Sequence, residues 1–370
     1  MTMGLYMRTK QAIPTNIVAQ DGTGTHTDIQ QAIDDLPTDG GKVYIKEGTY
    51  IISSRIYIKK SNVTIEGAGD GTILKAADNF HDYMIYIGDG INTYYSIFLN
   101  NFTIDHNDTG YSGADVAIVI DDYVHTPHIT NLYFKNVGGS GIVITSGQEQ
   151  IIISQCRFVN IFSAAINATA GILFIHDNYF SNCNNTIQLT NVSSANIMNN
   201  YFILGEGITG VYCSGSEHYL ICNNTFISNN PSTTTYGIYL GGTGKRAVIS
   251  NNTFKNMGIA IYLSSTSSCE ISNNAIYSCT NYGIYLTQSN DNIINGNYII
   301  YAISYDGIYF YSQCTNNIVT GNRITSCKYG IHEKDSTSDY NIITSNNCRG
   351  NSTGGILTYG THDIVANNLT

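Results

Sequence analysis

The stretch ISNNAIYSCTNYGIYL, residues 271–286, contains a pattern that recurs along most of the chain. Two further copies are ISNNTF followed by GIAIYL, within residues 249–263, and INGNYIIYAISYDGIYF, residues 294–310. From about residue 100 onward the copies follow one another every 21 to 30 residues. A repeat period in this range predicts a solenoid, in which each repeat is one structural unit stacked on the next.

Two columns of apolar residues keep step over ten repeats. The first column follows the Asn pair and consists of Ile104, Phe134, Phe158, Phe180, Phe202, Phe226, Phe254, Ile276, Ile299 and Ile324. The second follows a small residue, usually Gly, and consists of Ile142, Ile166, Ile187, Val211, Ile238, Ile261, Ile284, Ile308, Ile331 and Ile356. We expect both columns to point inward and to form the core.

The composition of each repeat favours strands over helices. Short alternating runs of Ile, Val, Tyr, Phe and Thr are broken by Asn, Ser and Gly, which is typical of strands and turns. The repeat length fits three short strands and three bends. We therefore expect an all-β solenoid, a single-stranded right-handed parallel β-helix of about a dozen coils stacked about 4.8 Å apart. The Asn pairs should share one bend, where their amides can hydrogen-bond along the axis.

The beginning of the chain differs from the repeats and predicts an N-terminal helical cap. We divide the chain into an N-terminal arm (1–14), the cap with the first coils (15–75) and the repeats (76–370). A helix is expected over residues 28–36, with Thr27 as its N-cap and Gln30 completing a capping box. Strands are expected at 42–45, 49–52, 56–58, 63–66 and 72–74. No cap is visible after the final repeat, so we expect a continuation, a partner chain or a second copy there.

The composition excludes several classes of protein. With 370 residues and 42% hydrophobic residues, the chain can bury the core of one elongated domain. No apolar run approaches the 18 residues of a membrane span, and residues 1–14 lack the apolar stretch of a signal peptide. The net charge of −10 argues against nucleic acid as a partner. The nine cysteines contain no C-x-x-C motif, and we expect buried free thiols.

A column of aromatic residues should lie on the outer surface. Strand alternation points the residue between the Ile and the Leu of the "G-I-Y-L" element outward. Over five consecutive repeats this residue is tyrosine, namely Tyr212, Tyr239, Tyr262, Tyr285 and Tyr309. Aromatic rings stack on sugar rings, so the column predicts a binding surface for an extended glycan. Two alternatives are a column that only stabilises the sheet and a contact surface for a partner protein.

The next repeat places His332 in the same outward column. It is followed by Glu333, Lys334 and Asp335, and alternation places His332 and Lys334 on the same outer face. His332 could therefore act in acid–base catalysis beside the tyrosine column. The alternative is an exposed polar patch.

A second candidate site lies in residues 78–128, which are rich in Asp and His. From this stretch we select Asp105, Asp121, Asp122 and His125 as candidate catalytic residues. Paired carboxylates about 5–9 Å apart could hydrolyse a glycosidic bond. The same oxygen ligands would suit Ca²⁺, and a solvated acidic loop is the third interpretation.

Several segments near the N-terminus carry a family resemblance. DGTG (21–24), TDIQQAID (27–34), GGKVYI (40–45), GTY (48–50) and NVTIEG (62–67) resemble the beginning of the pectin-lyase-like superfamily of right-handed β-helices. Residues 101–113 and 128–142 are similar to bacterial mannuronan C5-epimerases and other pectate-lyase-like proteins. The superfamily includes polysaccharide lyases, glycoside hydrolases, epimerases, esterases and phage tailspikes. The resemblance thus implies a polysaccharide or surface glycan as partner, and a location outside the cell or on a virion.

The chain departs from the family at the catalytic motif of the epimerases. Those enzymes carry Gly-Phe-Asp-Pro-His where this chain has GIVIT, residues 141–145, so Val143 and Thr145 replace the Asp and the His. The resemblance therefore transfers no catalytic residue. Three functions stay open: a polysaccharide lyase or glycoside hydrolase, a non-catalytic tailspike or other attachment protein, and a glycan-binding module without turnover.

Overall fold

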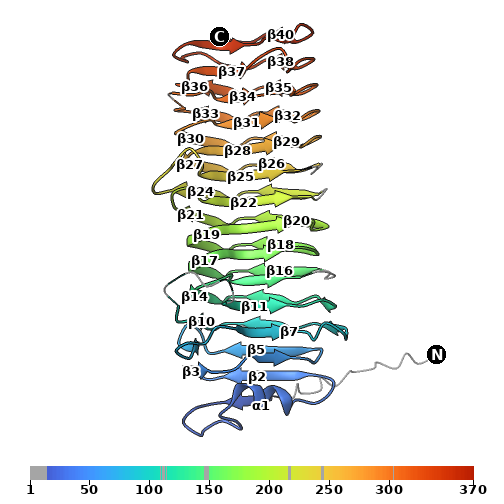
Figure 1. The fold of residues 1–370 in the computed structure, drawn as a ribbon, viewed down its shortest axis with the longest axis vertical. Helices are drawn as coiled ribbons and strands as arrows, with labels where there is room; N and C mark the ends of the chain where they lie inside the picture. Colours follow the sequence, from blue (N-terminus) through green and yellow to red (C-terminus); the bar gives the residue numbers. More distant parts are fainter. Residues whose placement is uncertain are drawn as a thin grey trace, which may run out of the picture.

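The protein is a stack of β-strand coils along one long axis (Figure 1). The computed structural model describes residues 15–108, 110, 113, 115–145, 150–215, 218–242, 246–302 and 304–370. The predicted arm, residues 1–14, lies outside the described residues. All strand pairs between coils are parallel, and the coils make about fourteen turns rather than about a dozen. The predicted parallel β-helix is confirmed.

Each coil contributes strands to three faces in the same order. The first face consists of β1 (Thr15–Val18), β2 (Gly41–Ile45), β5 (Val63–Gly67), β9 (Phe98–Asn100), β13 (His128–Thr130), β16 (Ile151–Ser154), β18 (Ile172–His176), β20 (Ser194–Met198), β23 (Tyr219–Cys222), β26 (Val248–Ser250), β29 (Glu270–Ser272), β32 (Ile293–Asn295), β35 (Ile318–Thr320), β38 (Ile342–Thr344) and β40 (Ile364–Ala366). The second face consists of β3 (Gly48–Ile52), β6 (Thr72–Ala76), β10 (Thr103–Asp105), β14 (Tyr133–Val137), β21 (Tyr201–Leu204), β24 (Thr225–Ser228), β27 (Thr253–Met257), β30 (Ala275–Cys279), β33 (Tyr298–Ile300) and β36 (Arg323–Thr325).

The third face consists of β4 (Ile56–Ile58), β7 (Tyr83–Ile87), β11 (Val116–Ile120), β15 (Ile142–Ile144), β22 (Thr209–Ser214), β25 (Tyr236–Gly241), β28 (Ile259–Ser264), β31 (Ile284–Thr287), β34 (Ile308–Phe310), β37 (Tyr329–Glu333) and β39 (Gly354–Leu357). Two long strands, β17 (Arg157–Ala168) and β19 (Tyr179–Thr190), run through the second and third faces without a break. The short strands β8 (Tyr94–Tyr95) and β12 (Val124–His125) pair with each other beside the third face.

The two predicted apolar columns form the core. The strand register pairs every member of the first column with the next, and the same holds for the second. In the first column six phenylalanine rings, from Phe134 to Phe254, are fully buried and stack with centroids 4.4–5.0 Å apart. Burial of such large apolar side chains is the main favourable contribution to folding.

The asparagine pairs lie at the bend between the first and second faces, and the two residues of a pair have different roles. The first Asn of a pair, as at Asn223 and Asn251, adopts the left-handed conformation with φ of 57°. The second Asn belongs to a hydrogen-bonded ladder, whose members are buried except for the half-buried Asn368. The ladder consists of Asn178, Asn200, Asn224, Asn252, Asn274, Asn297, Asn322, Asn346 and Asn368. In each step an Nδ2 donates to the Oδ1 one coil further on, at 2.9–3.0 Å.

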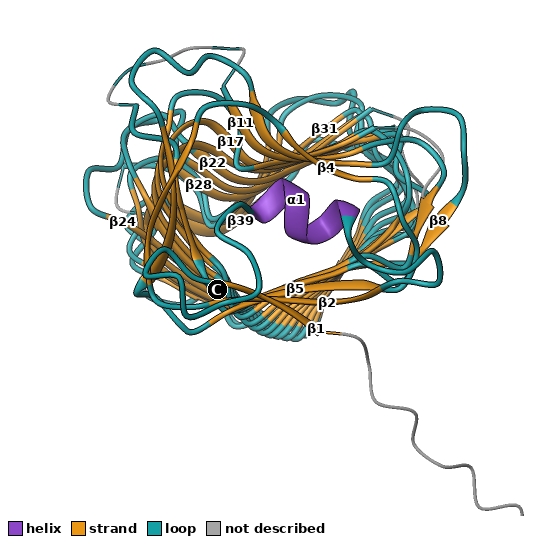
Figure 2. Cartoon of the chain, turned by 90° about the horizontal axis from the view of Figure 1, so that it is seen from below, coloured by secondary structure: helices purple, strands orange, loops and turns teal. Residues whose placement is uncertain are grey.

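The helix is shorter than expected. α1 (Ile29–Asp34) lies at the N-terminal end of the stack, and Figure 2 shows it within the outline of the coils. The prediction of Thr27 as its N-cap is wrong: Asp28 is the N-cap, and its side chain accepts a hydrogen bond from the Gln31 amide. Gln30 instead accepts from the Tyr57 amide on β4. The role of this short helix as a cap of the first coil stays a prediction.

Two further expectations are met by the described residues. All nine cysteines are free and buried, as predicted for thiols that pack as small apolar groups. Burial raises the pKa of several of these thiols, for example that of Cys327 to about 11. Among the described residues no helix is long and apolar enough to cross a membrane.

The asparagine ladder predicts a large effect of a single buried amide. Asn252→Ala should lower the free energy of unfolding by about 3 kcal/mol, because it leaves the Asn224 amide groups and the Ile221 carbonyl without their partner. The matched control is Asn230→Ala, which removes an exposed amide bonded to Glu206 and should cost less than about 0.5 kcal/mol. Urea unfolding followed by circular dichroism measures both. Equal effects of the two variants would contradict a structural role for the ladder.

Candidate functional site

The five predicted tyrosines form one continuous column on the third face, which we call the tyrosine track. Tyr212, Tyr239, Tyr262, Tyr285 and Tyr309 lie on β22, β25, β28, β31 and β34, and each is the register partner of the next. Four of them are half-buried, and Tyr309 is buried with 7% exposure. The tyrosine side chains thus point outward as predicted, but they are less exposed than strand alternation alone suggests.

A second row of tyrosines packs beside the track. Tyr236 lies 5.5 Å from Tyr239 and 5.7 Å from Tyr262, measured between ring centroids. Tyr282 stacks on Tyr309 at 4.6 Å. Burial raises the pKa of Tyr309 to about 12, so its phenol is neutral at physiological pH and can donate a hydrogen bond. The track therefore offers ring edges together with hydroxyl groups, while part of its aromatic area stabilises the sheet.

His332 follows Tyr309 in the same column, and its position is fixed by a buried carboxylate. Its Nδ1 lies 2.8 Å from Oδ2 of Asp306, which is only 4% exposed. The other carboxylate oxygen of Asp306 accepts a hydrogen bond from the Tyr329 amide at 3.0 Å. The rings of Tyr309 and Tyr329 lie 5.1 and 4.8 Å from the imidazole. His332 is thus held in one orientation at the end of the track.

Sequence reasoning missed Asp306. It belongs to the bend before β34, one coil away from His332, and the spacing of the repeat gives no sign that the two side chains meet. One departure from the repeat could have pointed to it. Asp306 precedes the Gly of its repeat, at the position that Tyr282 occupies in the preceding copy. Lys334 directly follows the end of β37, and its Nζ lies 3.8 Å from the ring centroid of Tyr311. Glu333, between His332 and Lys334, is fully buried and points inward.

The remaining candidate residues do not gather around His332. Asp105 lies at the end of β10, where it forms an ion pair with Lys135 at 3.2 Å and accepts a hydrogen bond from Asn136. Asp121 and Asp122 follow β11, at the opposite edge of the third face. From β11 to β37 the register passes through nine coil steps, or about 43 Å at the strand spacing.

The candidate residues near Asp121 contact neighbouring side chains of the coils. Asp122 accepts a hydrogen bond from the Thr145 hydroxyl at 2.8 Å. Asp121 is hydrogen-bonded to Tyr86, and this contact together with burial raises the pKa of that phenol. His125 on β12 stacks on Tyr95, with centroids 5.1 Å apart. These candidates therefore form a separate neighbourhood from Asp105 and from His332.

One group in the same stretch has the geometry of a cation site. The ligand atoms of His81, Asp108 and Asp115 all lie within 4.8 Å of one another. Asp115 is fully buried, whereas the side chain of His81 is 62% exposed. One imidazole with two carboxylates suits a transition metal such as Mn²⁺ better than Ca²⁺, which was one of the interpretations that the sequence left open. Residues 109, 111, 112 and 114 of the connecting loop lie outside the described residues.

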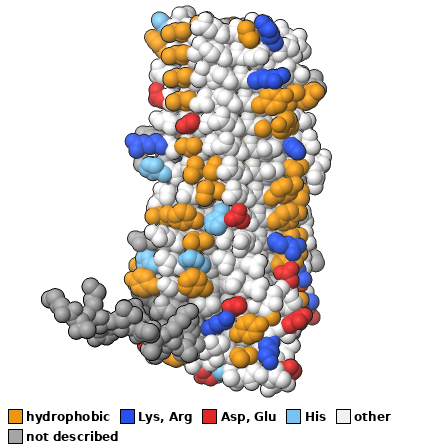
Figure 3. Space-filling model, turned by 180° about the vertical axis from the view of Figure 1, so that it is seen from behind, with side chains coloured by type: hydrophobic (Ala, Val, Ile, Leu, Met, Phe, Trp, Pro, Cys, Tyr) orange, Lys and Arg blue, Asp and Glu red, His pale blue; other side chains and the backbone are white. Residues whose placement is uncertain are grey.

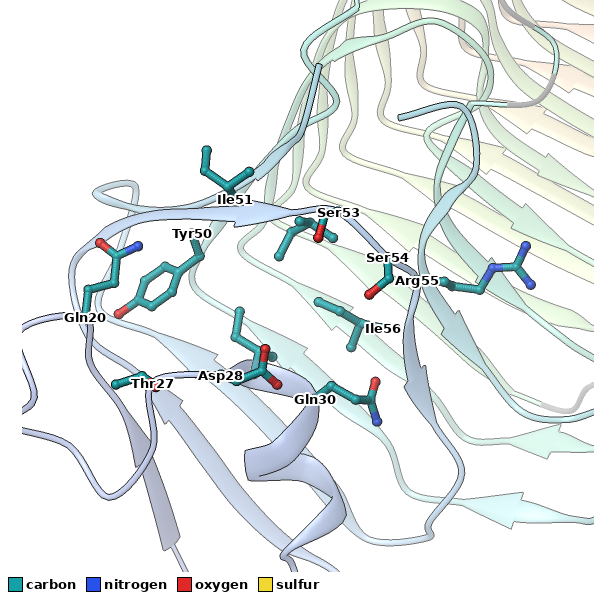
Figure 4. A pocket seen from close by; sticks show the side chains of 12 residues that line it. Gln20, Thr27, Asp28, Gln30, Tyr50, Ile51, Ser53, Ser54, Arg55 and Ile56 are labelled. Atoms are coloured by element: carbon teal, nitrogen blue, oxygen red, sulfur yellow. The ribbon is translucent and has the colours of Figure 1, made fainter. Parts of the chain in front are cut away.

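A polar pocket lies at the N-terminal end, far from the track. Figure 4 shows its lining side chains from α1, from the segment before it, and from the region of β3 and β4. Gln20, Asp28, Gln30, Tyr50 and Arg55 are among them. None of the candidate catalytic or glycan-binding residues selected from the sequence lines this pocket.

The surface repeats in columns on the other faces as well. Figure 3 shows hydrophobic side chains in columns that follow the long axis. On the first face Ile293, Ile318, Ile342 and Ile364 are consecutive register partners and are exposed. Exposed apolar columns are thus a general product of the fold, and the tyrosine track differs by its aromatic side chains and by the His332–Asp306 pair at its end.

Comparisons with known proteins place the chain in a family. Residues 17–207, just over half of the chain, match the family described as rhamnogalacturonase A/epimerase, pectate lyase-like. Residues 209–370 match the right-handed β-helix region. A curated relative is the probable pectinesterase 56 of Arabidopsis thaliana, which is 28% identical over 173 residues. That alignment covers 45% of this chain, and the chain spans only half the length of the relative.

Solved structures share the fold at low sequence identity. The A-module of the mannuronan C-5 epimerase AlgE6 from Azotobacter vinelandii superimposes with a TM-score of 0.58 and 15% identity, covering 92% of this chain and 93% of the module. The N-terminal fragment of bacteriophage phi29 gene product 12 gives a TM-score of 0.59 at 17% identity, covering 91% and 69%. The chain belongs to the rhamnogalacturonase A/epimerase, pectate lyase-like family of the pectin-lyase-like β-helix superfamily.

Proposed function

We propose that this protein binds an extended polysaccharide along the tyrosine track and that His332 acts as a general base at the end of the bound chain. The observation that carries the proposal is the unbroken register from Tyr212 to His332. The five tyrosines span about 19 Å at the strand spacing, enough for several sugar rings in a row. Aromatic rings contact the C–H faces of sugars, and the phenols hydrogen-bond to hydroxyl groups.

The buried carboxylate of Asp306 supplies what a general base needs. An ionised Asp306 accepts the Nδ1 proton of His332, so the other ring nitrogen is free to take a proton from a sugar or a water molecule. Asp306 also stabilises the imidazolium that forms in this step. It is a positioning residue, because it acts through His332.

Two lysines favour an acidic polysaccharide as the substrate. Lys334 contacts Tyr311, and the Nζ of Lys328 lies 5.9 Å from the centroid of Tyr329, which itself packs on His332. These cations can neutralise a sugar carboxylate next to the base. The relatives named above include a pectinesterase and a mannuronan epimerase, which supports a carbohydrate-related function without specifying the activity. We place the protein outside the cell or on a virion surface for the same reason.

A second candidate function is attachment to a surface glycan without turnover, as in a tailspike or a glycan-binding module. The separation of the candidate carboxylates favours it, because Asp105 and the Asp121 neighbourhood lie at opposite edges of the third face. The fold is also shared with a phage protein, which supports the fold alone. The two functions use the same track and differ only in the reaction at His332.

The track predicts face-specific binding. Tyr239→Ala and Tyr262→Ala should each weaken binding to polygalacturonate or alginate about 2- to 10-fold, the worth of one aromatic contact. Affinity electrophoresis in gels that contain these polymers, with a neutral glucan in parallel, measures the effect. Tyr201→Ala is the matched control, because Tyr201 stacks on Tyr179 at 5.9 Å on the second face and is 39% exposed. An equal loss in the control would show that the variants act through stability.

The general base predicts a loss of turnover without a loss of binding. His332→Asn should lower the rate of product formation at least about 100-fold and change polymer affinity only a few-fold. Products of cleavage, elimination or ester hydrolysis are detected by mass spectrometry on a panel of neutral and acidic polysaccharides. His125→Asn serves as the control from the other candidate neighbourhood. A loss in this control alone would move the site to the β11–β12 region, and binding without any product from the folded protein would favour attachment.

A further inference from the structure

The inward side of β37 carries a carboxyl group in the core. Glu333 is the register partner of Phe310, which is fully buried in the preceding coil, and Glu333 itself has no exposed surface. A buried carboxylate is costly unless it is neutral or well hydrogen-bonded. The contacts of Glu333 therefore decide in which protonation state this coil is stable.

Three donors meet the Glu333 carboxyl. Oε1 accepts from the side-chain amide of Asn341 at 2.8 Å. Oε2 accepts from the backbone amides of Tyr359 and Gly360 at 3.1 and 3.3 Å. These amides belong to the loop that connects β39 to β40, so Glu333 ties the coil that contains β39 and β40 to β37.

The carboxyl of Asp363 faces the same group. Asn341 ends a second buried ladder that includes Asn292 and Asn317, and its backbone amide donates to Oδ1 of Asp363 at 2.8 Å. In this ladder Asp363 stands where another asparagine would supply an amide donor as well. Within the described residues, its buried Oδ2 accepts no hydrogen bond from an N–H or O–H group.

A proton on Glu333 satisfies the remaining oxygen. Burial raises the pKa of Glu333 to about 7, and the neighbouring Asp363 carboxyl acts in the same direction. A neutral Glu333 can donate its hydroxyl proton to Oδ2 of Asp363. When this proton is lost, two carboxylates face each other, and Gly360 packs so closely on Asp363 that even an added Cβ would collide.

We propose that Glu333 and Asp363 form a proton-dependent latch, which holds the β39–β40 coil against β37 while the pair keeps one proton and loosens this coil when the proton leaves. His332, on the outward side of the same strand, then loses its neighbour in the column, Leu357. The latch concerns the free protein and stands apart from polysaccharide binding.

The sign of the pH dependence follows from the two states of Glu333. In the opened coil the glutamate is exposed and has its ordinary pKa of 4.5, whereas in the closed coil the pKa is about 7. Between these values the closed coil holds a proton that the opened coil releases. The equilibrium constant for opening should therefore rise about tenfold per pH unit from about pH 5 to 7 and level off above.

Two other histidine–carboxylate pairs lie near the latch. His362, next to Asp363, lies 2.8 Å from the Asp339 carboxylate on the outside, and His332 lies 2.8 Å from Asp306 on the other face of β37. Asp335, two residues after Glu333, is half-buried and accepts hydrogen bonds from Thr337. A test of the latch has to separate Glu333 from these groups.

Hydrogen exchange of the full chain between pH 5 and 8 measures the latch. Mass spectrometry follows peptides that cover residues 354–370, and each rate is divided by its intrinsic rate at the same pH. The wild-type protein should show the rise in opening described above. Glu333→Gln keeps an oxygen acceptor and places a permanent N–H donor opposite Asp363, so opening in this variant should not depend on pH. Asp363→Asn places the donor on the other side and removes the facing carboxylate. Glu333 stays buried in this variant, so the rise of opening with pH should be smaller than in the wild type without vanishing, which covers the case that the first variant fails to fold.

Controls decide between the latch and its neighbours. Asp335→Asn removes a nearby carboxylate outside the latch and should retain the wild-type dependence, and His362→Asn should retain it too. The proposal is overturned if opening of the wild-type coil does not change with pH, if both latch variants keep the wild-type slope, or if His362→Asn alone abolishes it. Polysaccharide affinity plays no part in this readout, so the latch and the proposed function fail independently.

Discussion

The buried asparagine ladder is the constraint on which the rest of the structure depends. The inner amides of the ladder are buried, and each is hydrogen-bonded to the amides one coil before and one coil after it. A buried amide without such partners costs about 1–3 kcal/mol, so the same residue has to occupy the same bend in successive coils. From Asn178 to Asn368 this requirement supports one register between coils, and the apolar and aromatic columns of these coils share that register.

The tyrosine track is a consequence of this alignment on the outer surface. Because Tyr239 and Tyr262 are register partners, their rings stack at 4.6 Å before any ligand is present. Stacking uses part of each ring, and four of the five track residues stay partly exposed. A surface of this kind is rigid, and a ligand that binds to it loses little free energy to ordering of the protein. The stabilising and the binding interpretation of the column are therefore compatible, and the control on the second face separates their contributions.

The sequence predicted what depends on the repeat, including the asparagine amides that hydrogen-bond along the axis at one shared bend, and missed contacts that depend on the conformation of individual loops. Both core columns, the strand bounds of the first coils and the outward tyrosines follow from alternation and period, which are local properties. The N-cap of α1 and the pairing of Asp306 with His332 depend on loop conformation between coils, which alternation does not determine. For the same reason the sequence could not show that Asp105 and Asp121 lie at opposite edges of the third face, or that His81 approaches Asp115.

Strand alternation also explains why two titratable groups with different roles share β37. His332 points outward to the end of the track, and Glu333, the next residue, points into the core. A carboxyl group is tolerated at this inward position because the loop of residues 358–363 donates backbone amides to it. Asp363 can in addition accept a hydrogen bond from the hydroxyl of a neutral Glu333. The β39–β40 coil thus contacts β37 on both sides: its loop hydrogen-bonds to Glu333 in the core, and Leu357 is the register partner of His332. The proposed latch and the proposed general base therefore lie on opposite sides of one strand of five residues.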